Sequence, residues 1–321
     1  MSMPCKICGN SENNSVYQAR EMMLGYRDVH DYFQCGECEC LQLEKIPDNL
    51  PDYYPKDYYS YSDVSFPTGI KRWLLAQRDY YAATGKGWLG KLLYARNPEA
   101  KIATLQATGI NRQSAILDVG CGAGHMLYSL KEAGFAHVQG ADPFNDGDIE
   151  YKNGVKIIKQ TIHEVQGKWD LIMFHHSFEH VADQLATLQS AAERLQEHGI
   201  CLIRVPTVSS WAWQHYGTDW VQLDAPRHLF LHSLKSMENL AKQAGLQVDK
   251  VIYDSFALQF WGSEQYQQDI ALHDKNSYAV NPDASPFSAG QIADFAKRSA
   301  ELNKQNQGDQ VCFYLSKRSG S

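Results

Sequence analysis

Glycine and acidic residues near position 120 have the spacing of a loop that binds a nucleotide or another anion. The segment AILDVGCGAGHML, residues 115–127, starts with a short apolar run and passes through Asp118 into Gly120, Gly122 and Gly124. The residues that follow are typical of a helix, so the order predicts a strand, a glycine loop and a helix. Glycines let the backbone approach a ligand closely, and the first turn of a helix offers free N–H groups to an anion.

The spacing of the glycines narrows the choice of ligand. A dinucleotide site uses G-x-G-x-x-G, in which the third glycine lets the helix pack closely on the strand. This chain has G-x-G-x-G instead, and His125 stands where that third glycine would be. Such a loop suits a ligand with one carboxylate and an adenosine better than a ligand with a diphosphate. We therefore expect S-adenosylmethionine at this loop.

Asp142 supports the same ligand. The segment HVQGADPF, residues 137–144, predicts a short strand that ends at Asp142. An acidic residue at the end of the second strand of such a unit accepts hydrogen bonds from ribose hydroxyls, although Asp before Pro is also common in ordinary turns. The spacing between Asp142 and the glycine loop favours the binding role. The residues expected at the cofactor site are Asp118, Gly120, Cys121, Gly122, Gly124, Asp142, Pro143, Thr161, Ile162 and His175.

Two C-x₂-C pairs near the N-terminus have the spacing of a zinc site. Cys5 and Cys8 form the first pair, and Cys35 and Cys38 form the second. Four thiolates can surround one Zn²⁺ tetrahedrally, and this closed shell leaves no position for water or substrate. The alternatives are four free thiols or a redox pair, but a redox pair needs one C-x₂-C beside a βαβ unit. We predict a structural zinc ion, with Cys40 as a leftover thiol that could compete as a ligand.

Four successive segments resemble the motifs of class I S-adenosylmethionine-dependent methyltransferases. They are ILDVGCGAGHML, GADPF, WDLIMFHHSFEHVAD and GICLIRVPT, and the resemblance spans residues 100–255. The later LDAPRHLFLHS and the N-terminal cysteines resemble a subgroup often encoded with bacterial surface-glycan and natural-product pathways. The resemblance implies a methyltransferase that acts on a small molecule or a glycan precursor.

The order of predicted elements indicates an α/β fold. Strands and helices alternate after residue 111, which predicts a doubly wound, mostly parallel sheet. The resemblance implies seven strands in a Rossmann-like sheet, with an antiparallel last strand. The segment before that strand is too long for a hairpin turn and predicts a helical insertion. The predicted parts are a zinc-binding module with a Tyr-rich linker (1–62), a helical connecting segment (63–110), and a methyltransferase domain (111–321) with its insertion (255–309).

Three histidines follow predicted strands at the edge where open α/β sheets bind ligands. His176 and His180 belong to HHSFEHVAD, and His228 belongs to VQLDAPRHLF, where Asp224 can orient it. A hydroxyl acceptor must lose its proton during methyl transfer, and neutral histidine can accept a proton near pH 7. The histidines could instead only cap and pack. The run also matches H-x-x-E-H, a metallopeptidase signature, but that signature needs a helix interior and this run follows a strand.

Aromatic residues cluster just before His228. Trp211, Trp213, Tyr216 and Trp220 could pack over the sheet edge, or they could form a wall on which a sugar ring or a planar acceptor stacks. Arg227 could bind an acidic group of the acceptor. The tyrosines of the linker could likewise pack between the parts of the chain or line a substrate cleft.

Composition excludes several classes of protein. The start MSMPCKICGN lacks the apolar region of a secretory signal, and no run approaches the 18 or so apolar residues of a membrane span. We therefore expect a cytoplasmic protein whose eight cysteines are thiols or metal ligands. Residues 1–62 hold 5 Lys and Arg against 10 Asp and Glu, whereas residues 63–115 hold 8 against 3. The basic segment could pack on the core, or it could meet a phosphorylated or membrane-attached substrate.

Two other functions compete with this interpretation. An RNA methyltransferase could grip RNA with its Cys₄ module, but the module here is acidic and phosphate attracts Lys and Arg. A non-catalytic protein could keep the fold for binding alone, but the glycine loop and Asp142 are intact. We therefore expect methyl transfer from S-adenosylmethionine to a small molecule, a sugar nucleotide or a glycan precursor, with a hydroxyl as acceptor. The sequence indicates no oligomeric state.

Overall fold

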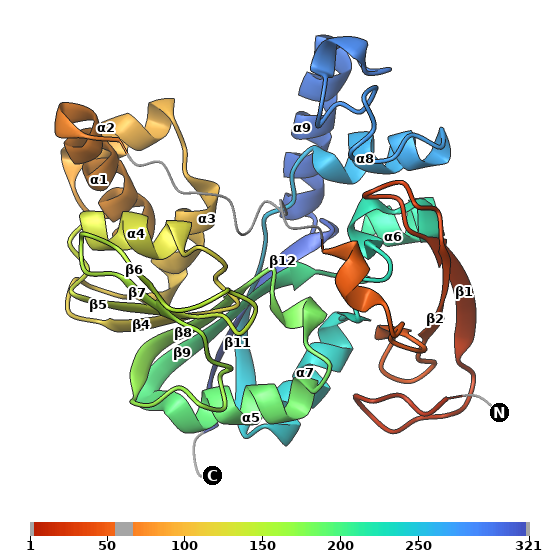
Figure 1. Cartoon of the computed structure of the whole chain (residues 1–321), viewed down its shortest axis with the longest axis horizontal. Helices are drawn as coiled ribbons and strands as arrows, with labels where there is room; N and C mark the ends of the chain where they lie inside the picture. The colour runs from red at the N-terminus through yellow and green to blue at the C-terminus, as the bar shows by residue number, and fades with distance from the viewer. Residues whose placement is uncertain (1–2, 55–66, 319–321) are drawn as a thin grey trace.

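The computed structural model describes residues 3–54 and 67–318. Figure 1 shows a central sheet with helices on both faces and an N-terminal module beside its carboxyl edge. Part of the predicted Tyr-rich linker, residues 55–66, lies outside the described residues.

The central sheet has the strand order β11-β12-β9-β8-β4-β5-β7-β6. Neighbours from β9 to β7 pair in parallel, whereas β12 runs antiparallel to both β9 and β11. The strands are β4 (Ala115–Val119), β5 (His137–Ala141), β6 (Ile149–Glu150), β7 (Lys156–Ile158), β8 (Trp169–His175), β9 (Leu195–Pro206), β11 (Leu246–Tyr253) and β12 (Gln310–Lys317). The predicted antiparallel last strand is confirmed.

The predicted number of strands is wrong by one. β6 adds an eighth strand at the edge, where it pairs antiparallel with β7. It has two residues, Ile149 and Glu150, which is too short for the period-two alternation that identifies a strand in a sequence. The sheet is therefore mixed at both edges, around a parallel centre.

Helices cover both faces because successive strand residues point to opposite sides. In β4, Ile116 packs in one buried cluster and Leu117 in the other. The first face is covered by α1 (Gly69–Thr84), α3 (Ala100–Ala103) and α4 (His125–Glu132), with α2 (Trp88–Arg96) packed on α1. The second face is covered by α5 (Gln184–Arg194) and α7 (Leu234–Gln243). This arrangement confirms the doubly wound fold.

The N-terminal module is built on a second, smaller sheet. β1 (Ser15–Arg20) and β2 (Val29–Gln34) form the hairpin between the two cysteine pairs, and β3 (Leu41–Leu43) pairs with β2. The fourth strand of this sheet, β10 (Phe230–Leu231), comes from the part of the chain that forms the central sheet and pairs antiparallel with β3. The module therefore completes its sheet with a strand that lies about 190 residues further along the sequence.

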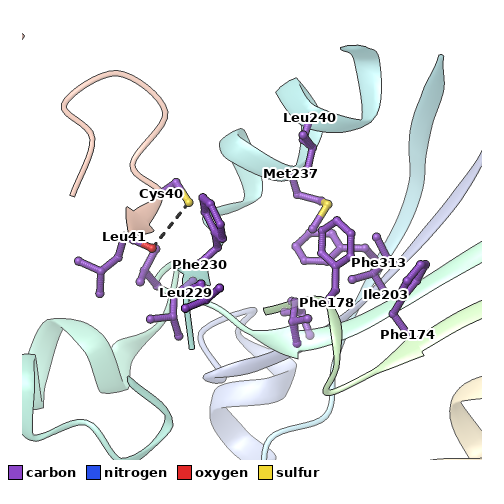
Figure 2. Packing of buried hydrophobic residues seen from close by; sticks show 14 of the residues in the cluster. Cys40, Leu41, Phe174, Phe178, Ile203, Leu229, Phe230, Met237, Leu240 and Phe313 are labelled. Carbon is purple, nitrogen blue, oxygen red and sulfur yellow. Dashed lines mark hydrogen bonds between the residues drawn. The ribbon is translucent and has the colours of Figure 1, made fainter. Parts of the chain in front are cut away.

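One hydrophobic cluster joins the module to the central sheet. It contains the buried Leu41 of β3, Phe230 of β10, Met237 of α7 and Ile203 of β9. Figure 2 shows Leu41 and Phe230 on the side of the module, and Met237 and Ile203 on the side of α7 and the central sheet, all members of one cluster. A chain of about 45 residues cannot bury a large core alone, so much of the module's apolar surface is buried against the part of the chain that forms the central sheet.

The predicted insertion before the last strand is helical. It contains α8 (Leu258–Gln267) and α9 (Ala289–Lys304), which stand beyond the carboxyl edge of the sheet near α6 (Trp211–Tyr216) (Figure 1). Among the described residues, no helix combines the length and the apolar character needed to cross a membrane.

Because the N-terminal module and the central sheet share one hydrophobic core, we predict that they unfold together. Phe230 is 2% exposed and packs between them. Truncation to Ala should lower the free energy of unfolding by about 3–5 kcal/mol while leaving a single transition in chemical denaturation. Tryptophan fluorescence and far-ultraviolet circular dichroism should report the same midpoint. Two separate transitions, with the module lost first, would contradict a shared core.

Candidate functional site

The glycine loop lies where β4 ends and α4 begins. Gly120 and Gly124 have φ values of +72° and +75°, a region that favours glycine. A Cβ on Gly120 would lie 2.4 Å from the Cβ of Ser177, whose hydroxyl donates to the carbonyl of Val119 at 2.6 Å. The loop therefore needs glycine for both conformation and space, and it leaves the start of α4 open to a ligand.

Asp142 closes the same loop from the end of β5. Its Oδ2 accepts a hydrogen bond from the N–H of Gly122 at 2.7 Å, and its Oδ1 accepts one from the N–H of Phe144 at 2.9 Å. Asn145 is 5% exposed and donates to the carbonyl of Gly122 at 3.0 Å. Asn145 was not among the predicted site residues, because an Asn in a turn after a strand is too common to indicate a binding role.

Asp118 is a buried carboxyl group at the centre of this loop. It is 4% exposed, and within the described residues its Oδ1 makes no hydrogen bond. Burial, and then the neighbouring charge of Asp142, raise the pKa of Asp118 to about 8. A buried acid of this kind favours a cation that enters beside it.

The other predicted cofactor residues lie at the same edge of the sheet. The backbone of Cys121 is part of the loop, Pro143 follows Asp142, and Thr161 and Ile162 follow β7. His175 ends β8, and neither of its ring nitrogens has a hydrogen-bond partner among the described residues. Burial, followed by the charge of Arg204, lowers the pKa of His175 well below its ordinary value, so this ring is neutral.

His180 and His228 face each other at the turn that follows β8, and Ser177, which begins this turn, packs against Gly120 of the glycine loop. The ring centroids of the two histidines are 4.8 Å apart. The Nδ1 of His180 lies 2.9 Å from the carbonyl oxygen of Arg227, and the Nδ1 of His228 lies 2.8 Å from the carbonyl oxygen of Gln222. A carbonyl only accepts, so each of these two bonds places a proton on Nδ1. The hydroxyl of Tyr54 also lies 3.1 Å from Nδ1 of His180. In this tautomer the basic nitrogen of each ring is Nε2.

His176 is placed differently from the other two predicted histidines. Its Nε2 lies 2.7 Å from Nη1 of Arg204, which always donates, so this nitrogen is already an acceptor. Its Nδ1 points to Oε1 of Glu179 at 3.3 Å. With both ring nitrogens engaged, His176 is suited to hold Glu179 in place rather than to accept a proton.

Glu179 is a fully buried carboxylate between the three histidines. Its Oε1 lies 3.3 Å from Nδ1 of His176 and 3.9 Å from Nε2 of His228, and its side chain is 1% exposed. Burial alone would raise the pKa of Glu179, but His176, His180 and His228 outweigh it and lower the pKa to about 2. For His180, burial and then the charge of His228 lower the pKa below its ordinary value. At neutral pH the site thus holds a charged Glu179 beside a neutral His180.

The H-x-x-E-H run does not form a metallopeptidase helix. Phe178–His180 is a single turn of 3₁₀-helix, as expected from its place after a strand. One carboxylate oxygen of Glu179 and one ring nitrogen each of His180 and His228 lie within 4.8 Å of one another. This turn brings the two histidines together across 48 residues of sequence, around one carboxylate.

Most of the predicted aromatic wall is packed inside the protein. Trp213, Tyr216 and Trp220 are buried, and Nε1 of Trp220 donates to Asp309 at 2.9 Å. Trp211 alone of the four is partly exposed. The packing alternative is therefore confirmed for three of these four residues, because α6 lies under the helical insertion.

Arg227 is also buried rather than open to an acceptor. Its guanidinium is fully covered and pairs with Asp224 and, at 3.1 Å, with Glu21. The interpretation that it binds an acidic group of the acceptor is therefore wrong. The reason is a carboxylate that arrives from the module, 206 residues away in the sequence.

The four predicted cysteine ligands meet at one point of the module. The Sγ atoms of Cys5 and Cys38 are 3.5 Å apart, as are those of Cys8 and Cys35, and all four lie within 4.8 Å of one another. Four sulfurs at 2.3 Å from one ion would be about 3.8 Å apart, so the cluster fits a tetrahedral metal. The nearby Cys38 thiol and the N–H groups around Cys5 lower the pKa of Cys5 to about 5. Cys40 lies outside this group, with its Sγ directed at the carbonyl of Leu41.

Comparison with known proteins agrees with this geometry. Residues 93–251 match the model of a family described as a methyltransferase domain. This span contains the glycine loop, Asp142 and both facing histidines. The chain therefore contains a methyltransferase domain.

Solved structures with a similar fold are distant in sequence. The cyclopropane synthase MmaA2 from Mycobacterium tuberculosis is 14% identical, with 79% of this chain and 100% of that chain covered and a TM-score of 0.44. Magnesium protoporphyrin IX methyltransferase from Synechocystis is 15% identical, with 63% and 90% covered and a TM-score of 0.39. Similarity this low says nothing about the acceptor of this chain. No curated protein matches its sequence.

Proposed function

We propose that this protein transfers a methyl group from S-adenosylmethionine to a hydroxyl group of a small molecule, such as a sugar nucleotide or another glycan precursor. The observation that carries this proposal is the facing pair His180 and His228, which leave Nε2 as the basic nitrogen when Nδ1 donates to a backbone carbonyl. The turn that carries His180 begins at Ser177, which packs against Gly120 of the glycine loop. A hydroxyl acceptor needs such a base, whereas an amine or a carbanion does not.

S-adenosylmethionine would supply an electrophilic methyl group on a positively charged sulfur. The residues at the glycine loop fit it: Asp142 can accept from the ribose hydroxyls, and the open start of α4 can meet the carboxylate. Asp118, with an unpartnered buried oxygen, suits the positive end of the same molecule. We assign the remaining cofactor contacts to Gly120, Cys121, Gly122, Gly124, Pro143, Thr161, Ile162 and His175.

The acceptor side of the reaction depends on the two histidines. Either Nε2 can take the hydroxyl proton as the oxygen attacks the methyl group, and Nδ1 stays bonded to a backbone carbonyl. Glu179 stabilises the imidazolium that forms, because a buried negative charge favours the charged form of a neighbour. Holding the nucleophile in line with the methyl group supplies much of the remaining acceleration.

The Cys₄ cluster is assigned to a structural zinc ion. Its four sulfurs leave no open position for catalysis. An RNA acceptor is less well supported, because the module that would have to grip RNA is acidic, with 5 Lys and Arg against 10 Asp and Glu in residues 1–62.

Binding of S-adenosylmethionine should release a proton from Asp118. In the free protein its pKa is about 8, so most of it is protonated at pH 7. A positively charged ligand lowers that pKa, and the proton leaves on binding. Calorimetry in two buffers with different ionisation enthalpies measures the release. Asp118→Asn should abolish it and weaken binding, whereas Asp170→Asn, at the opposite end of the sheet, should do neither. An enthalpy that is independent of buffer would contradict the assignment.

The metal assignment predicts one zinc ion per chain. Cys8→Ser should lose the ion and lower the melting temperature, because the ion contributes to folding of the module. Cys40→Ser removes a nearby buried thiol that is not a ligand and should keep the ion. Elemental analysis of protein purified without chelators measures both. Wild-type protein without zinc would count against this site.

The base assignment predicts the effect of removing either histidine. An acceptor is first found by screening nucleotide sugars for release of S-adenosylhomocysteine. With it, His180→Ala or His228→Ala should lower kcat by roughly 10²–10⁴-fold while S-adenosylmethionine affinity stays nearly unchanged. The exposed His163→Ala is the control. Because burial lowers the pKa of His180, the wild-type rate should fall only below about pH 6.5. Near wild-type rates in both variants would show that the acceptor needs no base.

A further inference from the structure

We infer that the N-terminal module is part of the catalytic apparatus, and that Tyr32 and Glu21 are positioning residues for His228 and His180. This inference rests on the proposed role of the two histidines. It gives the module a function beyond carrying a metal, and it identifies residues that no sequence motif marks.

The first contact holds the backbone of His228. Tyr32 lies in β2 of the module and is completely buried. Its hydroxyl donates to the carbonyl oxygen of His228 at 2.8 Å, across 196 residues of sequence. This bond fixes the peptide that carries the imidazole, whose ring is fixed at its other side by the carbonyl of Gln222.

The second contact holds Arg227, the residue before His228. Nη2 of Arg227 donates to Oε1 of Glu21 at 3.1 Å, with both side chains fully buried. Glu21 is itself held in place by the N–H groups of Leu24, Gly25 and Tyr26 at 2.8–2.9 Å. The carbonyl of Arg227 is the acceptor for Nδ1 of His180. Glu21 therefore restrains, through one residue, the nearer of the two groups that contact Nδ1 of His180, the other being the hydroxyl of Tyr54 at 3.1 Å.

Backbone pairing continues on the other side of His228. The N–H of Leu43 in β3 donates to the carbonyl of Leu229 at 3.0 Å, and β3 then pairs with β10. The N–H of Leu229 donates to the carbonyl of Glu179 at 2.9 Å. The loop that carries His228 is thus held between the module and the turn that carries Glu179 and His180.

Outside the module, the loop is attached near its two ends: the side chains of Trp220 and Gln222 donate to Asp309, and the N–H of Leu229 donates to the carbonyl of Glu179. The module holds the middle of the loop, through the carbonyl of His228 and the guanidinium of Arg227. The loop lies between the one-turn helix at Val221–Leu223 and the two-residue strand β10. Such short elements do not hold a loop by themselves. A base must keep its nitrogen within hydrogen-bond reach of the acceptor, and a small displacement costs a large part of the rate. Loosening the module should therefore lower turnover before it affects cofactor binding.

The test is Tyr32→Phe, which removes one oxygen atom and keeps the ring. Tyr314→Phe is the matched control, because Tyr314 is a buried tyrosine whose hydroxyl also donates to a backbone carbonyl, that of Thr104, away from the histidines. Each variant loses one hydrogen bond and should lose similar stability. Glu21→Gln tests the second contact and replaces Tyr32→Phe if that variant does not fold.

The readout is the ¹⁵N nuclear magnetic resonance of the histidine side chains in the full-length protein. Wild type should show the Nδ1–H tautomer for His228 and His180 at pH 7. Tyr32→Phe should shift the His228 signals towards mixed tautomers, and Glu21→Gln should do so for His180, while Tyr314→Phe changes neither. S-adenosylhomocysteine affinity should stay within about twofold in all three. With an acceptor, Tyr32→Phe should lower kcat about tenfold or more with little change in the KM for S-adenosylmethionine.

Two results would overturn the inference. One is a Tyr32→Phe variant whose histidine signals and kcat match those of Tyr314→Phe. The other is an equal loss of turnover in both tyrosine variants, which would show a general effect of stability. The ¹⁵N signals do not require turnover. If the histidine-to-alanine variants keep wild-type rates, the proposed base fails, yet the signals still decide whether the module positions the rings.

Discussion

The buried guanidinium of Arg227 is the interaction on which the arrangement of the site depends. It binds Asp224 within its own loop, Glu21 of the module, and the carbonyl of Tyr53 at 3.2 Å. A planar group with five donors can meet partners from three directions, which Lys could not. Losing one partner of a buried ion pair costs about 3–5 kcal/mol, because the other charge remains buried. The loop, the module and the chain after β3 are therefore fixed by one residue.

The buried carboxyl groups of the site lie where the proposed methyl transfer would place positive charge. The methyl donor has a positive sulfur, which becomes neutral when the methyl group leaves. In the proposed mechanism the hydroxyl proton passes to a histidine, so a positive charge would appear on that ring as the charge on sulfur is lost. The cofactor side has the buried carboxyls Asp118 and Asp142, and the acceptor side has Glu179. Buried carboxylates on both sides stabilise the positive charge before and after transfer, and burial keeps water from screening them.

Short sequence patterns predicted those parts of the fold that depend on residues close together in the chain. The glycine loop, the cysteine pairs and the alternation of strands and helices each need particular residues at short spacing, and all appear in the structure as expected. β6 was not predicted, because two residues are too few to show the alternation of apolar and polar side chains that identifies a strand. The aromatic residues before His228 were ambiguous, because a packed wall and an exposed wall have the same composition. The structure resolved that ambiguity by placing α6 beneath the helical insertion.

The remaining errors come from contacts between distant segments. Nothing near Arg227 in the sequence indicates that Glu21 will neutralise it, so an exposed role was a reasonable expectation. Tyr32 carries no motif, and its partner is a backbone carbonyl that any residue could supply. Asn145 and the pairing of β3 with β10 are hidden for the same reason. Residues that position other residues are visible only once the chain is folded.

The proposed metal site and the loop that carries His228 are coupled through α7 and the shared core. The hydroxyl of Ser233 donates to the carbonyl of Cys38 at 2.6 Å, and the side-chain amide of Gln243 donates to the carbonyl of Ile7 at 2.8 Å. The backbone of both cysteine knuckles is thus bonded to α7 or to the residue that begins it. Order in the proposed metal site therefore favours order in β10 and in the loop before it. Coupling between sites is reciprocal, so under the proposed assignments an acceptor that orders this loop would also tighten the hold of the four cysteines on a zinc ion. A structural metal far from the reacting atoms can in this way influence the reaction through the stability of one loop.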